Sequence, residues 1–131
     1  MTWTIDPRKF GFETEEDHRR LCIGIAFEIN TRLALGTPVD TGRAQINWLP
    51  TIEAPANGEV AGIKEKNVAV GNTVHRANAE FEKAPMFPNL YITNNVEYII
   101  DLDMGTSTQA PHGIVNIAVQ AVAENAGGVQ L

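Results

Sequence analysis

A long amphipathic helix with a sharply defined end is the feature that most constrains the fold of this chain. Thr14 is a good helix cap, and the three acidic residues that follow it complement the helix dipole. The helical pattern continues to about Leu35, with one apolar stripe formed by Cys22, Ile25, Ala26, Ile29 and Leu33. Gly36 can end the helix with a positive φ, and Pro38 prevents its continuation. The chain must therefore turn here, and the stripe must pack against another element.

Two predicted helices carry more apolar surface than one packing partner would cover. On the first helix, Ile23, Phe27 and Ala34 lie away from the stripe. The last helix is predicted from Ile114 to about Asn125, and its apolar residues leave only a narrow polar arc. Surplus apolar surface on a small domain predicts a second partner, such as a neighbouring subunit. The candidate subunit-interface residues are Ile23, Phe27, Val115 and Val119.

The remaining segments predict a small sheet. Alternating apolar and polar residues indicate a strand over 43–53, with Pro50 requiring an edge position or a bulge. Other predicted segments are a weak strand within 60–70, a helix over 73–83, a strand over 90–93, a turn at Asn94-Asn95, and either a strand or a helical turn over 96–103. The expected fold class is α+β, with a long N-terminal helix and a C-terminal helix packed on a small, mostly antiparallel β-sheet. We expect an N-terminal arm over residues 1–13 and a single domain over 14–131.

The segment after the first helix contains an Asp-Thr-Gly sequence with two incompatible interpretations. In a dimeric aspartic protease, Asp40 would supply one carboxylate of a dyad that shares a proton. Two features argue against this: Arg43 would pull both carboxylates toward ionisation, and a helix precedes the motif in place of the strands typical of these enzymes. In the structural interpretation, Asp40 and Thr41 accept bonds from backbone N–H groups, Gly42 tolerates the required φ, and Arg43 opens a strand and pairs with an acid. The segment would then be a helix-to-strand corner.

Composition argues against several function classes. A formal net charge of −6 does not suit a protein that coats nucleic acid, because phosphate neutralisation needs clustered Lys and Arg. No run approaches the roughly 20 apolar residues of a membrane span, and no basic, apolar leader begins the sequence. The histidines lack metal-site spacing, and the chemistry-bearing residues have structural interpretations: His18 as a solvated helix residue, Cys22 as a buried thiol, Asp101 and Asp103 as a solvated edge, and Ser107 as part of a polar turn. The sequence therefore predicts no catalytic residue, no metal and no cofactor.

Several motifs in a fixed order resemble the neck and tail-completion proteins of tailed bacteriophages, which are small head-to-tail connector or minor tail components. The motifs are Thr37-Pro38-Val39-Asp40-Thr41-Gly42-Arg43, Asn47-Trp48, Tyr91-Ile92-Thr93-Asn94-Asn95-Val96-Glu97-Tyr98, Leu102-Asp103-Met104-Gly105-Thr106-Ser107 and Gln109-Ala110-Pro111-His112-Gly113, followed by an apolar helix. Their order and spacing match from about residue 20 to 125. The family usually has Tyr-Ala after the Asn-Asn turn and often Glu before the final Gly-Thr. This chain has Tyr98-Ile99 and Asp103-Met104-Gly105 there.

The resemblance implies a structural role without catalytic residues. Proteins of this family have an α+β fold and form a ring in the neck between the capsid portal and the tail. We accordingly expect a homo-oligomeric ring, taken to be a hexamer, that is made in the bacterial host cytoplasm and resides in the virion. Its partners would be itself and the head-completion or adaptor and tail proteins, with DNA passing through the lumen without specific binding and no membrane involved. A tail terminator ring at the same junction is the alternative within this class.

Overall fold

A computed structural model describes residues 15–38, 42–63, 65–107 and 109–125 of the 131-residue chain. The elements are α1 (Glu15–Gly36), α2 (Arg43–Ile46), β1 (Leu49–Ile52), α3 (Lys66–Phe81), β2 (Leu90–Thr93), α4 (Ile99–Asp103) and α5 (Val115–Asn125). A long N-terminal helix, a C-terminal helix and a small antiparallel sheet confirm the expected α+β class. The predicted arm over residues 1–13 lies outside the described residues.

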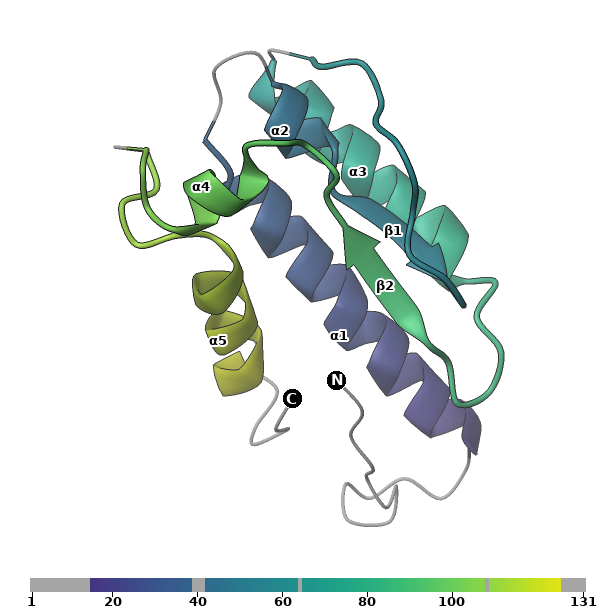
Figure 1. Cartoon of the computed structure of the whole chain (residues 1–131). Coiled ribbons are helices and arrows are strands. Elements are labelled where there is room, and N and C mark those ends of the chain that lie inside the picture. Colours follow the sequence, from purple (N-terminus) through teal and green to yellow (C-terminus); the bar gives the residue numbers. More distant parts are fainter. Residues whose placement is uncertain (1–14, 39–41, 64, 108, 126–131) are drawn as a thin grey trace.

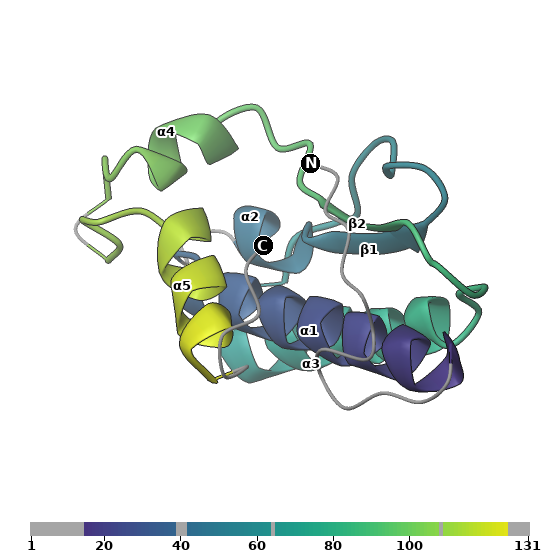
Figure 2. The same cartoon turned by 90° about the horizontal axis from the view of Figure 1, so that it is seen from below.

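The two strands form one layer that lies over α1 and α3 (Figure 2). They pair antiparallel, from Leu49 opposite Thr93 to Ile52 opposite Leu90. Within the described residues each strand has one neighbour, so both are edge strands. Pro50 is tolerated in β1 for this reason, since an edge strand has a side on which a missing N–H breaks no ladder bond.

Helix α1 lies at the centre of the packing. It contacts α3 on one side and α5 on the other, and Figure 1 shows α5 running alongside it. The main core cluster consists of Leu33, Ala34, Trp48, Ala110, Ile114 and Ala118. The core cluster therefore brings the last turns of α1 together with residues as distant in the sequence as Ala118 of α5.

Helix α3 replaces the weak strand predicted within 60–70. It begins at Lys66, earlier than the predicted start at residue 73, and no regular element occupies 60–63. Its fully buried side chains recur every four residues, at Ala69, Thr73, Ala77 and Phe81. This stripe of buried side chains packs against α1 and β1. Tertiary packing therefore makes the start of α3 helical where the local sequence predicts a weak strand.

The strand predicted over 43–53 is wrong in its first half, because Arg43–Ile46 forms α2 and only Leu49–Ile52 is extended. Alternation normally indicates a strand whose polar side chains face water. Here the polar residues Gln45 and Asn47 are fully buried. The alternation of apolar and polar residues therefore does not mark one buried and one solvent-exposed face of a strand. The segment over 96–103, which the sequence left open, contains the short helix α4.

Candidate functional site

The predicted corner after α1 is a connection between two helices. Gly42 has φ 75° and stands at the N-cap of α2, which confirms that this position needs a residue tolerant of the left-handed region. Arg43 is the first residue of α2, so the expectation that it opens a strand is wrong. Asp40 and Thr41, the other two predicted corner residues, lie outside the described residues. Described helices flank the motif on both sides, unlike the strands around the dyad loop of an aspartic protease.

Arg43 makes the acid pairing that the sequence predicts. Its Nε and Nη2 donate to the two carboxylate oxygens of Glu59 at 2.7 and 2.8 Å, which is the bidentate geometry of a strong charge-assisted pair. Nη1 lies 3.6 Å from Glu97, and the guanidinium carbon is 5.5 Å from the centre of the Tyr98 ring. The hydrogen bond to Glu59 raises the pKa of Arg43, and the same bond lowers the pKa of Glu59.

Thr37, rather than Gly36, closes the C-terminal end of α1. Gly36 is the last helical residue and is not among the glycines with positive φ, so the predicted left-handed stop at this position is wrong. The Thr37 hydroxyl donates to the carbonyl of Leu33 at 2.6 Å and accepts the indole N–H of Trp48 at 2.7 Å. Because all of these groups are buried, one side chain caps a helix and anchors the core tryptophan.

A chain of buried polar side chains continues from Trp48 into α3 and back to α1. The hydroxyl of Thr73 donates to the carbonyl of Trp48 at 2.6 Å, and the Asn30 amide donates to both the hydroxyl and the carbonyl of Thr73 at 3.3 Å. Gln45 donates to the carbonyl of Ala34 at 2.9 Å. These contacts fix α1, α2, α3 and β1 relative to one another. The sequence pattern does not predict these contacts, and its one hint of them is the presence of polar residues inside apolar stretches.

The Asn-Asn motif after β2 fastens two other segments. Asn94 donates to the carbonyl of Ala44 at 2.9 Å and accepts the backbone N–H of Val96 at 3.1 Å, which is the geometry of a side chain that forms its own turn. Asn95 donates to the carbonyls of Ala56 and Gly58 at 2.9 and 3.2 Å. The predicted turn is therefore confirmed, and it also holds α2 and the loop after β1.

The last two motifs join α4 to α5 through a reciprocal contact, the α4/α5 clasp, formed by Asp103, Gly105, Pro111 and Gly113. The Asp103 carboxylate accepts the backbone N–H groups of Ile114 and Val115 at 3.0 and 2.8 Å, and thereby caps α5. Asp103 is therefore a helix cap and not simply part of a solvated edge. Gly105 and Gly113 have φ 88° and 86°, and a Cβ there would overlap the carbonyl oxygens of Pro111 and Asp103 respectively. Only glycine fits either position.

Residues from four of the motifs line one cavity of about 490 Å³ beside the corner. Its lining includes Gly42 and Arg43 from the first motif, Tyr98 from the Asn-Asn segment, and Leu102, Ser107 and Gln109 from the last two motifs. The Ser107 hydroxyl accepts the backbone N–H of Gln109 at 3.2 Å, so its predicted role in a polar turn is confirmed. The motifs are far apart in the sequence and form one region in space.

The four predicted interface residues are all half-buried. Ile23 and Phe27 lie on the side of α1 that also carries Asn30, whose side-chain amide donates to Thr73 of α3. Val115 and Val119 lie on α5. Other large apolar side chains are exposed to solvent and are not among the four predicted interface residues. They are Leu35, Val60, Val68, Met86, Phe87, Ile100, Met104 and Ile117. Assignment of these residues to an interface remains a prediction.

Other chemistry-bearing residues have structural environments. His18 is buried and lies 5.8 Å from the ring of Phe87, so the expectation of a solvated histidine is wrong. Cys22 is half-buried, and desolvation raises the pKa of its thiol, which disfavours the reactive thiolate. Among the described residues, no group of three or more His, Cys, Asp or Glu could hold a metal ion. In that part of the chain no helix is long and apolar enough to cross a membrane.

No protein-family model, curated protein or solved structure matches this chain.

Proposed function

We propose that this protein is a structural component of the neck of a tailed bacteriophage, where copies form a closed ring that joins or completes the junction between head and tail. The ordered set of motifs from Thr37 to Gly113 is the observation that carries the proposal. A shared short motif is weak support, whereas five in the same order and spacing are a specific pattern.

The positions of these motifs in the fold support a role based on shape. Arg43 of the first motif pairs with Glu97 and lies over Tyr98 of the third. In the last two motifs, Asp103 caps α5 and the backbone packs closely around two glycines. The motif residues thus fix the relative positions of α1, α2, β2, α4 and α5. Motif residues that fix the architecture in this way suit a protein whose surface must fit its neighbours.

The distribution of apolar side chains supports assembly with other subunits. Ile100 on α4 and Met104, the residue directly after α4, are 70% and 78% exposed, and Ile117 is 52% exposed on α5. Exposed apolar surface on a protein marks interaction sites. The formal net charge of −6 also suits a ring whose lumen lets DNA slide without adhering, since like charge disfavours binding.

The test is removal of the protein from the phage that encodes it. A nonsense mutation in its gene should yield filled heads and separate tails that do not join, and supplying the wild-type protein should restore infectious particles. A cryo-EM map of the wild-type virion should contain this polypeptide in the neck. Normal joined virions made without the protein, or a neck map with no density for it, would refute the proposal.

A further inference from the structure

Ile100 of α4 and Met104, which caps the C-terminal end of α4, form an apolar ridge that we call the α4 ridge. The two residues are four positions apart and therefore lie on the same side of the helical segment. Ile99 and Leu102 face the opposite way and pack against the main core cluster. The α4 ridge is the most exposed pair of large apolar side chains among the described residues, and its exposure follows from the way that α4 is seated on the core.

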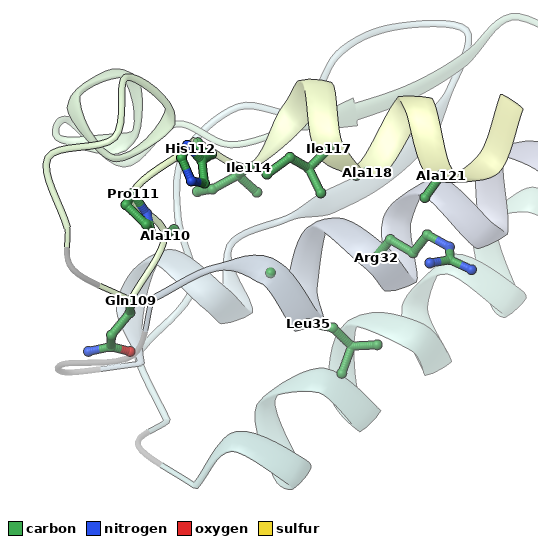
Figure 3. A pocket seen from close by; sticks show the side chains of 12 residues that line it. Arg32, Leu35, Gln109, Ala110, Pro111, His112, Ile114, Ile117, Ala118 and Ala121 are labelled. Carbon is green, nitrogen blue, oxygen red and sulfur yellow. The ribbon is translucent and has the colours of Figure 1, made fainter. Parts of the chain in front are cut away.

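A groove of about 380 Å³ lies between the C-terminal half of α1 and α5, and we call it the α1/α5 groove (Figure 3). Its apolar lining includes Leu35 of α1 and Ile117, Ala118 and Ala121 of α5. Leu35 and Ile117 are 49% and 52% exposed. The groove is therefore an uncovered apolar surface of a size that accepts one or two large side chains.

The ridge and the groove carry opposite charges. Helix α4 contains Asp101 and Asp103 and has no basic residue. Of the residues that line the groove, Arg32 is cationic and none is acidic. Arg32 pairs with Glu28 through Nε at 3.1 Å, and its two terminal nitrogens make no hydrogen bond within the described residues. An acidic, apolar-tipped helix therefore matches an apolar groove with a cationic rim.

We propose that the α4 ridge of one copy occupies the α1/α5 groove of a second copy, with Asp101 of α4 facing Arg32, since the Asp103 carboxylate caps α5 within its own subunit. This inference rests on the proposed ring, because it names the contact between subunits. Ridge and groove are different surfaces, so the contact is heterologous and leaves one free ridge and one free groove on every pair. Such a contact can repeat from copy to copy and gives a ring when the rotation between copies closes, whereas a contact between two identical surfaces stops at a dimer.

Two single variants test the direction of the contact. Ile100→Asp disables the ridge and leaves the groove, and Ile117→Asp disables the groove and leaves the ridge. Val68→Asp is the matched control, because Val68 is 54% exposed on α3, which packs against α1, α2 and β1. All three variants should keep the wild-type circular dichroism spectrum, since each changes an exposed side chain.

Sedimentation velocity over a range of concentrations gives the result. The wild type and Val68→Asp should form oligomers larger than dimers, and each interface variant alone should associate at least about tenfold more weakly. An equimolar mixture of Ile100→Asp and Ile117→Asp should form dimers and nothing larger, because one intact ridge meets one intact groove. A wild type that remains monomeric, variants that assemble like the wild type, or a mixture with no dimer would each refute the inference.

A charge-reversal pair provides a second measurement. Asp101→Arg and Arg32→Asp should each weaken association, and the double variant should recover part of the loss because the attractive pair is restored with its signs exchanged. No recovery would contradict the placement of Asp101 against Arg32. The inference and the proposed function fail separately. An oligomer with this contact that is absent from virions refutes only the neck role, and a neck ring unaffected by these variants refutes only the contact.

Discussion

Replacing Thr37 with Val removes one buried hydroxyl while keeping the shape of the side chain. In the native fold this hydroxyl donates to the carbonyl of Leu33 and accepts the indole N–H of Trp48. Both partners are buried, and the Leu33 carbonyl lies in the last turn of α1, where no intrahelical N–H follows. The substitution therefore leaves one acceptor and one donor in the core without partners.

The expected loss of stability is about 3 kcal/mol, because each orphaned buried polar group costs roughly 1–3 kcal/mol and no cavity forms. For a chain of this size, a loss of that magnitude lowers Tm by ~10 °C. Urea denaturation followed by circular dichroism should show the same loss as a lower midpoint with an unchanged slope. Thr31→Val is the control, since its hydroxyl bonds the Phe27 carbonyl within α1 and the change should cost under about 0.5 kcal/mol.

A double-mutant cycle with Trp48→Phe tests the mechanism. Phe has no indole N–H, so in that background Thr37→Val should cost about 1–2 kcal/mol less than in the wild type. Equal costs in the two backgrounds, or a Thr37→Val variant as stable as Thr31→Val, would refute the assigned role of this hydroxyl.

The other predictions concern the Arg43 pair and the α4/α5 clasp. Arg43 lowers the pKa of Glu59, so the carboxylate contributes stability above its usual pKa of about 4.3 and loses it as pH falls through the lowered pKa. The wild type should therefore melt slightly above Glu59→Gln at pH 7, with the difference disappearing in acid; a difference that grows in acid would contradict the sign. Gly113→Ala should cost more than about 2 kcal/mol, because its Cβ overlaps the Asp103 carbonyl at a positive φ. Gly24→Ala, where a Cβ meets nothing within 4 Å, should instead raise Tm by a few degrees. Asp103→Ala should cost about 1 kcal/mol through loss of the α5 cap, and an unchanged Tm would show that the cap is dispensable.

Elements whose local pattern agrees with their packing could be predicted from the sequence. The first helix has acidic residues in its first turn, a stripe and a proline just beyond its end, and the strand at 90–93 is bounded by Pro88 and Asn94. By contrast, the sequence predicts a strand where α2 forms, because Gln45 and Asn47 alternate with apolar residues. Their amides bind backbone carbonyls inside the fold, so they are buried without being apolar. Sequence periodicity detects polarity and does not detect whether a polar group has found a partner.

The candidate site shows the same limit. Pairing of Arg43 with an acid could be expected from its chemistry, whereas the choice of Glu59 depends on where the loop after β1 returns. The two glycines of the clasp could be recognised as turn residues. Their close contacts with the backbone carbonyls of Pro111 and Asp103 could not be predicted, because only folding brings these segments together. The sequence likewise does not predict that Ile100 and Met104 are exposed, since their exposure depends on which side of α4 faces the core.

The α4/α5 clasp has a mechanical consequence. Asp103 belongs to α4 and caps α5, and Gly105 and Gly113 let the backbones of the two segments approach each other closely. A force applied to α4 is therefore passed to the first turn of α5 through the Asp103 side chain. If a neighbouring subunit binds α4, the force reaches α5, which lines the α1/α5 groove of the same subunit. Each subunit that joins would then stiffen the site at which the next one is received, and a partly built assembly would favour its own completion.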